Sequence, residues 1–257
     1  MKKIFKILVG TILLLTVKIA SANDKVVFGT NWLAQGGHGG FYQALADGTY
    51  EKHGLDVEIM MGGPQMNNRP MLIAKKLDFL MTGNLLLSFD NVRNGIPTMV
   101  VAAFFQKDPQ AMISHQGSYN NFSDLSNAPT VLVSKDGQFS FWKWLVNEHG
   151  FKDEQVKPYG YNLAQFLSDK MMVQQAYGTA EPLYAAAAGA KPQTFLLADH
   201  GWTTYSTTIE ARSEMVEDNP QLVQRFVNAS IEGWYNFLYG DRTAAYELIM
   251  KDNPEMT

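Results

Sequence analysis

Short apolar segments that resemble strands alternate with segments that resemble helices along almost the whole chain. Residues 55–60 (Leu-Asp-Val-Glu-Ile-Met) alternate apolar and polar side chains, which is the pattern of a half-buried strand. Residues 41–53 lead up to Gly54 and predict a helix that ends there. This alternation argues against an all-helical or all-strand domain and predicts an α/β fold.

The order of these segments predicts two α/β lobes that the chain joins by two crossings, near residues 106–114 and 201–208. A strand after residue 204 is expected to return to the first block, and only helices follow it. Each lobe should hold a mixed sheet flanked by helices, with a ligand cleft between the lobes. We expect a leader at residues 1–22 and the first part of lobe 1 at 23–110. Lobe 2 should follow at 111–204, and a helical, truncated return to lobe 1 at 205–257.

The leader has the three regions of a secretory signal peptide. A lysine-rich start at residues 2–6 precedes an apolar run at 7–17 and a small-x-small cleavage site at 20–22. An uncleaved membrane anchor is the alternative, which Lys18 slightly favours. We expect cleavage and export.

Composition excludes several function classes. The 21 basic residues include four lysines of the leader, so the cleaved chain carries 17 basic and 25 acidic residues, a net charge of −8. Such a surface repels phosphate backbones, and nucleic acid is not an expected partner. The chain has no cysteine, which removes disulfides, thiolate metal sites, cysteine nucleophiles and the lipid-attachment residue of bacterial lipoproteins. We therefore expect a monomer that is free in the periplasm.

The most informative segment is residues 30–44, Thr-Asn-Trp-Leu-Ala-Gln-Gly-Gly-His-Gly-Gly-Phe-Tyr-Gln-Ala, between a predicted strand and a predicted helix. Ligands of open α/β sheets bind beyond the carboxyl ends of the strands. Glycines there expose backbone N–H groups, and a helix N-terminus favours electron-rich atoms. Trp32, His38 and Gly39 are therefore candidate ligand-binding residues. The alternative is a glycine-rich loop with a packed tryptophan.

A second candidate segment is residues 174–182, Gln-Gln-Ala-Tyr-Gly-Thr-Ala-Glu-Pro. The ring of Tyr177 could stack on a heteroaromatic ligand, and the carboxylate of Glu181 could accept hydrogen bonds from a ring amine. Thr179 is expected to cap the helix that follows. The alternative role for Glu181 is that of a first-turn acid that favours the helix dipole.

Weaker candidates follow other predicted strands, where simple turns are the alternative. Gly63, Pro64 and Asn84 should lie on the same rim of the cleft. Residues 135–137 are expected to form a turn. Asp136-Gly137-Gln138 should open the helix that follows, and Gly137 could supply N–H donors there from the second lobe.

Several familiar constellations are missing from the sequence. There is no GxSxG, P-loop or GxGxxG motif, so no catalytic residue and no cofactor is predicted. No metal site is predicted either, because four of the histidines are isolated, without HxxxH or HxH spacing: His53, His115, His149 and His200. Tyr159 and Tyr161 could line the cleft, but nothing in the sequence selects them.

Residues 30–44, together with 50–57 (Tyr-Glu-Lys-His-Gly-Leu-Asp-Val) and 62–64, resemble the NMT1/THI5-like family. The likeness is greatest to the ThiY-type binding proteins of ABC importers for thiamine pyrimidine precursors. Their usual motif is close to Asn-Trp-x-Ala-Gln-x-Glu-His-Gly-Gly-Phe-Tyr-Gln-Ala. This chain has Gly37 where the motif has glutamate, which leaves the exact ligand open.

The resemblance covers nearly the whole cleaved chain and is more specific in its first half. It implies a two-lobe periplasmic binding protein fold of type II-like architecture, and a chain that continues beyond residue 257. It also implies ligand contacts at Asn31, Trp32, Tyr177 and Glu181.

The main functional hypothesis is therefore a solute-binding protein that delivers hydroxymethylpyrimidine or a formylaminopyrimidine to an ABC permease of the inner membrane. Riboflavin, a sulfonate such as taurine, and nitrate are alternative ligands. A second hypothesis is an enzyme like the hydroxymethylpyrimidine phosphate synthases, which the resemblance associates with pyridoxal phosphate, iron and a cysteine-rich motif. The absence of cysteine argues against it. A third is a periplasmic sensor or scaffolding domain.

Overall fold

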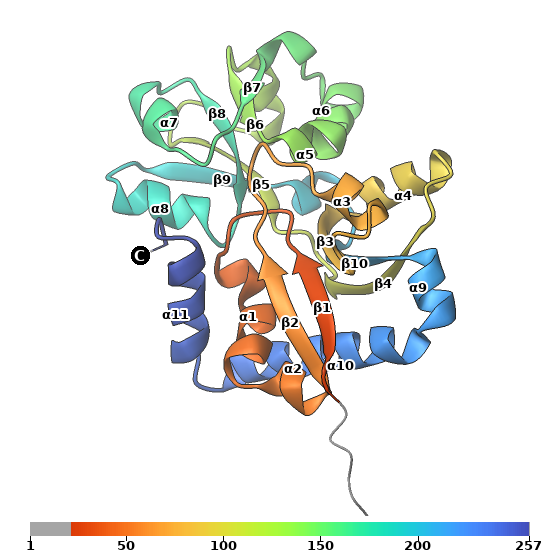
Figure 1. Ribbon diagram of the computed structural model, residues 1–257. Helices are drawn as coiled ribbons and strands as arrows, with labels where there is room; N and C mark the ends of the chain where they lie inside the picture. Colours follow the sequence, from red (N-terminus) through yellow and green to blue (C-terminus); the bar gives the residue numbers. More distant parts are fainter. Residues whose placement is uncertain (1–21, 257) are drawn as a thin grey trace, which may run out of the picture.

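The computed structural model describes residues 22–256. The strands form two five-stranded sheets, and each sheet is the centre of one lobe (Figure 1). The predicted signal peptide lies outside the described residues except for Ala22. No helix within residues 22–256 combines the length and the apolar character of a bilayer-spanning segment.

The first sheet mixes parallel and antiparallel pairs, in the order β2-β1-β3-β10-β4. β1 (Asp24–Gly29) lies parallel to both β2 (Leu55–Met60) and β3 (Phe79–Asn84). β10 (Ser206–Arg212) is antiparallel to β3 and to the edge strand β4 (Thr98–Phe105). A strand from late in the chain is therefore inserted between two early ones.

The second sheet is also mixed, in the order β7-β6-β8-β5-β9. β6 (Val131–Val133) lies parallel to β7 (Val156–Pro158) and β8 (Val173–Tyr177). β5 (Gln110–His115) is antiparallel to β8 and to β9 (Pro192–Leu196). All of these strands come from one continuous stretch of chain, whereas the first lobe is built from two separate stretches.

Helices flank both sheets (Figure 1). The first lobe carries α1 (Gly39–Ala46), α2 (Thr49–Lys52), α3 (Arg69–Ile73), α4 (Leu85–Arg93), α9 (Ser213–Asp218), α10 (Pro220–Tyr239) and α11 (Thr243–Asp252). The second lobe carries α5 (Lys135–Phe139), α6 (Phe141–His149), α7 (Ala164–Ser168) and α8 (Glu181–Ala187). Short 3-10 turns are η1 (Gly36–His38), η2 (Phe122–Asn127), η3 (Asp153–Gln155) and η4 (Leu197–His200).

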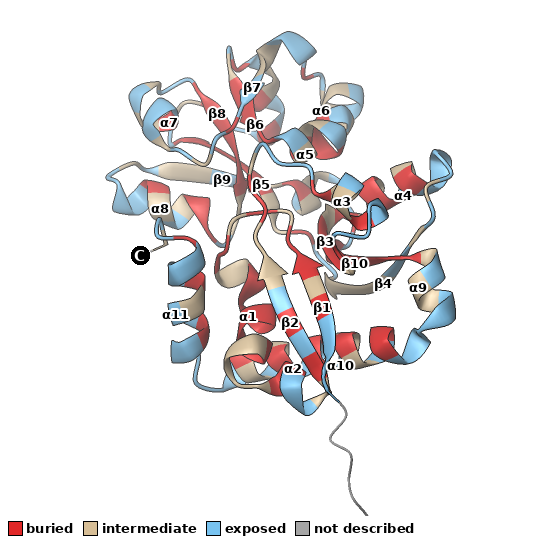
Figure 2. Ribbon diagram, in the orientation of Figure 1, coloured by how far each residue is buried: buried red, intermediate tan, exposed pale blue. Residues whose placement is uncertain are grey.

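Aromatic rings fill the core between the first sheet and its helices. Figure 2 shows buried stretches in β1, α1 and α10, which enclose this core. Phe79 of β3 stacks on Phe226 of α10, with ring centroids 4.1 Å apart. Phe28 of β1 packs edge-on against Phe226 at 5.2 Å and against Phe41 of α1 at 4.9 Å. Burying a ring of this size contributes roughly 2–3 kcal/mol. These contacts fix α1 on β1, and so fix both ends of the loop that joins them.

Three local expectations are wrong. The helix expected over residues 41–53 is interrupted after Ala46, because Gly48 adopts a left-handed conformation with φ of 72° and Asp47 accepts a hydrogen bond from the N–H of Thr49. Residues 135–137 are the first turn of α5, not a simple turn, since the Ser134 side chain caps that helix.

The third correction concerns the start of α8. Ala180, not Thr179, is the N-cap residue of this helix, and no side chain caps it. The proline in the first turn, Pro182, supplies the helical backbone angle there instead.

Candidate functional site

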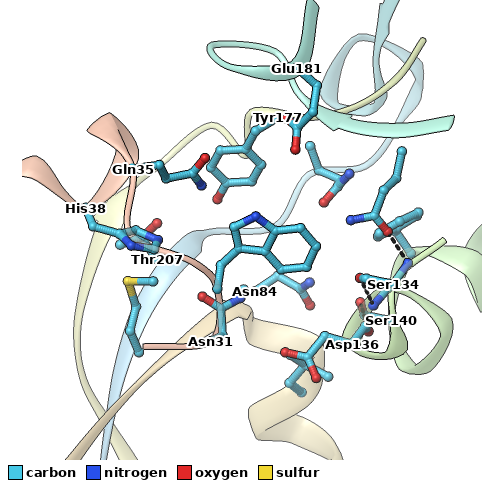
Figure 3. A pocket seen from close by; sticks show the side chains of 18 residues that line it. Asn31, Gln35, His38, Asn84, Ser134, Asp136, Ser140, Tyr177, Glu181 and Thr207 are labelled. Atoms are coloured by element: carbon cyan, nitrogen blue, oxygen red, sulfur yellow. Dashed lines mark hydrogen bonds between the residues drawn. The ribbon is translucent and has the colours of Figure 1, made fainter. Parts of the chain in front are cut away.

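A cavity lies between the two lobes, and its empty volume of about 600 Å³ includes open solvent (Figure 3). Both sheets contribute to its wall. The residues that line it are Asn31, Trp32, Gln35, His38, Met81, Gly83, Asn84, Leu87, Gln110, Ser134, Asp136, Gly137, Ser140, Phe141, Gln175, Tyr177, Glu181 and Thr207.

The loop after β1 is held rigidly by its own hydrogen bonds. The Thr30 hydroxyl donates to the carbonyl of Trp32 at 2.8 Å, and the N–H of Gly62 donates to that same carbonyl at 3.2 Å. Asn68 donates from its amide to the carbonyl of Thr30 at 2.9 Å. These bonds fix the backbone on which Asn31 and Trp32 reach the cavity.

Trp32 stacks on a tyrosine of the other lobe. Its ring centroid lies 6.0 Å from that of Tyr159, with 23° between the planes, and Tyr161 meets it edge-on at 6.1 Å. Trp32 follows β1 of the first sheet, whereas both tyrosines follow β7 of the second. The aromatic cluster therefore bridges the lobes beside the cavity.

Glu181 is a buried carboxyl group at the first residue of α8. It accepts a hydrogen bond from the backbone N–H of Tyr177 at 2.7 Å and from the Tyr159 hydroxyl at 3.4 Å. Burial raises the pKa of Glu181 to about 7. The group can therefore meet a ligand either as a neutral acid or as a carboxylate near neutral pH.

Two further polar side chains at the cavity each have a buried atom without a hydrogen-bond partner in the described part of the chain. Gln35 Oε1 and His38 Nδ1 are buried and have no hydrogen-bond partner within residues 22–256. Burial lowers the pKa of His38 to about 3, so its ring is neutral. Figure 3 shows both side chains near Tyr177 and Thr207. Because an unsatisfied buried polar atom is costly, these atoms mark a place where a bound molecule would supply hydrogen bonds.

The second lobe contributes the residues around the start of α5. The Gln175 side chain accepts a hydrogen bond from the Ser134 backbone N–H. The N–H of Gly137 donates to the Ser134 hydroxyl at 3.2 Å, so this N–H is engaged in the helix cap. Gly137 lines the cavity, but its N–H already has a partner inside the protein.

Seven of the ten predicted ligand-binding residues share this cavity: Asn31, Trp32, His38, Asn84, Gly137, Tyr177 and Glu181. The other three do not line it. Gly39 lies under Phe237, where a Cβ atom would come within 2.1 Å of the ring. Gly63 is next to Met66 and Leu33, and the carbonyl of Pro64 accepts a hydrogen bond from the N–H of Lys135 in the other lobe.

The remaining lining residues were not predicted. Gln35 lies inside the glycine-rich motif, and the polar character of that motif could have indicated it. Gln110, Gln175 and Thr207 lie on β5, β8 and β10, and only the order of strands in the sheets brings them to the cavity. Asp136 was noted only as a neighbour of a possible backbone donor.

The cavity wall has acidic residues but no basic lysine or arginine within the described residues. Glu181 and Asp136 are its acidic residues, and no lysine or arginine of residues 22–256 lines it. Within the same range, no group of three or more histidine, aspartate or glutamate side chains is placed to hold a metal ion.

A model of the NMT1/THI5-like family matches residues 35–241 of this chain. No curated protein matches the chain significantly in sequence. The matched residues include every residue of the cavity wall except Asn31 and Trp32.

Several solved structures share the fold. A protein from Bordetella bronchiseptica RB50 is 15% identical, with a TM-score of 0.66 over 91% of this chain and 83% of its own. The periplasmic aliphatic sulphonate binding protein SsuA from Escherichia coli is 14% identical, with a TM-score of 0.57 over 90% of this chain and 80% of its own.

A periplasmic binding protein from Salmonella typhimurium, described by its high arginine specificity, is 13% identical, with a TM-score of 0.58 over 88% of this chain and 98% of its own. At such low identities the likeness shows the fold alone. It confirms the predicted two-lobe periplasmic binding protein architecture.

Proposed function

This chain belongs to the NMT1/THI5-like family, and from that premise we propose that it delivers a small heteroaromatic nutrient from the periplasm to an ABC importer. The preferred ligand class is a thiamine pyrimidine precursor of the hydroxymethylpyrimidine or formylaminopyrimidine type. One observation carries this proposal: Trp32 and Glu181, from different lobes, line the same buried cavity. A flat ring and a carboxyl group in one cavity suit a flat molecule with an amine on its edge.

In this mechanism the ligand holds the two lobes together. Its ring lies beside Trp32 of the first lobe, and its amine donates to Glu181 of the second. Because the ligand bonds both lobes only when they are closed, it shifts the molecule toward the closed form. The closed form then docks on the permease, and no covalent step is needed.

The segment 1–22 supports export to the periplasm, with cleavage after Ala22. We expect the exported protein to act as a monomer, because one chain already supplies both walls of the cavity. The permease is the expected protein partner.

The charge of the cavity argues against the anionic alternatives. Sulfonate and nitrate carry negative charge, and a binding site for them needs cations or several N–H donors. Here two acidic side chains line the wall and no lysine or arginine of residues 22–256 does. Riboflavin has an uncharged ring system and remains an alternative that a binding experiment separates.

Isothermal titration calorimetry tests the proposal. Hydroxymethylpyrimidine and formylaminopyrimidine should bind, whereas taurine, nitrate and riboflavin should give no heat. Trp32→Ala should weaken pyrimidine binding at least about tenfold, since it removes one ring face from the site. Tyr239→Ala, an exposed aromatic on α10, is the control and should bind normally. No heat from either pyrimidine would reject the assignment.

A further inference from the structure

Asp136 places a second carboxyl group at the cavity. The proposed contact between a ring amine and Glu181 gives this second group no role. Figure 3 shows Asp136 at the end of the cavity opposite Glu181. Asp136 is half-buried, and its carboxyl group, unlike that of Glu181, accepts no hydrogen bond from residues 22–256 and forms no ion pair within 4.0 Å there.

The neighbouring cations do not satisfy this carboxyl group. Arg69 and Lys135 attract it only from a distance. The Arg69 guanidinium donates instead to the carbonyl of Leu87, at 2.9 Å, and to the Asn91 side chain. Burial nevertheless dominates and raises the pKa of Asp136 to about 6. The Asp136 carboxyl group is thus partly dehydrated at the cavity and has no protein donor within residues 22–256, so a ligand amine could donate to it in place of water.

A second wall residue also has an acceptor without a donor. Gln35 is 4% exposed, and its Oε1 has no donor within residues 22–256. The neutral ring of His38 has an unpartnered Nδ1 in the same range, which donates or accepts according to the tautomer. A ligand that donates to both Asp136 and Gln35 would satisfy two acceptors of the wall.

Resting on the proposed function of the same cavity, we propose that Asp136 binds a protonated amino group on a short arm of the ligand, at the end opposite the ring amine. The preferred ligand class is then a cationic aminopyrimidine with an aminomethyl arm, in place of the uncharged hydroxymethyl or formylaminomethyl arm. The same carboxyl group rejects the phosphate ester of the hydroxymethyl compound. Asp136 is thus a specificity-determining residue, because it favours a positively charged arm over a neutral or negatively charged one.

The test compares three probes on the wild-type protein by isothermal titration calorimetry near neutral pH: hydroxymethylpyrimidine, its aminomethyl analogue and its phosphate ester. The aminomethyl analogue should bind at least about tenfold more tightly than the hydroxymethyl compound, because a hydrogen bond between charged groups is worth more than a neutral one. The phosphate ester should give no heat.

Asp136→Asn should abolish the preference for the aminomethyl analogue, so that the variant binds this analogue and hydroxymethylpyrimidine with affinities within about threefold of each other. Glu154→Gln removes an exposed acid of the same lobe and should change neither affinity. The comparison on wild type needs no variant, so the proposal stays testable if Asp136→Asn folds poorly.

The outcomes separate this inference from the proposed function. If the hydroxymethyl and aminomethyl compounds bind wild type equally, the charge-reading role of Asp136 is wrong and the pyrimidine assignment stands. If the preference persists in Asp136→Asn, the role is also wrong, because another group reads the arm. If no pyrimidine binds, the proposed function fails and this inference fails with it.

Discussion

At the scale of single residues, Glu181 shows how the fold prepares a ligand group. The side chain is 3% exposed, yet a backbone N–H and a tyrosine hydroxyl donate to it. The dehydration raises its pKa to about 7, and the two donors limit the rise. A bound amine would therefore shift the protonation equilibrium of Glu181 toward the carboxylate form.

Glu181→Gln should become more stable relative to wild type as the pH rises. The folded-state pKa of Glu181, about 7, lies above its usual 4.5, so its contribution is complete below pH 4.5 and is lost as the pH rises through 7. The free energy of unfolding of wild type should fall relative to the variant by on the order of 3 kcal/mol over this range. Denaturant titration of the ligand-free proteins near pH 5 and pH 8 measures it.

The lowered pKa of His38 has the opposite effect on the pH dependence of stability, but it does not affect the difference between the two proteins. Its folded-state pKa of about 3 lies below the usual 6.5, so stability is lost as the pH falls below 6.5. Both proteins contain His38, and its contribution cancels in their difference. Gln221→Ala, which changes no ionisable group, is the control for this pH dependence. A Glu181→Gln difference that does not change with pH would mean that the buried carboxyl does not titrate as described.

The sequence could indicate Trp32 and Glu181 because each lies in a local pattern, a glycine-rich loop or the first turn of a helix. It could not select Tyr159. That residue reaches Trp32 and Glu181 only because β7 lies parallel to β6 and the two lobes close on each other. Contacts of this kind depend on pairing between distant segments, which one sequence does not reveal.

At the scale of elements, the contact between α1 and α10 depends on glycine. A Cβ atom at Gly233 would lie 2.3 Å from the carbonyl oxygen of Gly40 and 2.6 Å from the Cβ of Ala44. Because the first of these is a backbone atom, it cannot rotate away. The close approach seats α10 on α1, and through α1 on the loop that carries Trp32.

Gly233→Ala should therefore destabilise the protein, although alanine favours helix more than glycine does by about 1 kcal/mol. Forcing the helices apart costs about 1–3 kcal/mol beyond that gain, which lowers the Tm by several degrees for a chain of this size. Thermal unfolding followed by circular dichroism measures the change. Gly160→Ala is the matched control, since no atom lies within 4 Å of its Cβ position. Equal Tm values for the two variants would contradict this account.

Element prediction succeeded where the local signal was strong. Residues 55–60 form β2 with the expected bounds. It failed at α5 because Asp136-Gly137 is typical of turns, while the cap that decides the conformation is the preceding Ser134. Helix α9 was not predicted, since its six residues have no cap in the sequence.

At the scale of the whole molecule, direct contacts join the lobes apart from any ligand. The N–H of Lys135 donates to the carbonyl of Pro64 at 3.0 Å, and the Gln65 side chain donates to the carbonyl of Tyr159 at 2.8 Å. At the crossings between the lobes, the Trp202 ring N–H donates to the Asp108 carboxyl group at 2.7 Å. These bonds stabilise the closed arrangement around the cavity.

Gln65→Ala should weaken ligand binding although Gln65 does not line the cavity. Losing one bond between the lobes destabilises the closed form by about 0.5–1.5 kcal/mol, which raises Kd roughly two- to tenfold. Calorimetry on the variant, with small-angle scattering to measure closure, tests this. Gln221→Ala on α10 is the control. An unchanged Kd and an unchanged scattering curve would show that this bond does not contribute to closure.

The insertion of β10 between β3 and β4 also sets the order in which the molecule can assemble during synthesis. Every strand of the second sheet has emerged once residue 196 is free, but the first sheet has a gap until residues 206–212 arrive. The amino-terminal third of the chain must therefore wait, with the edges of β3 and β4 unpaired, while the middle third is already able to fold.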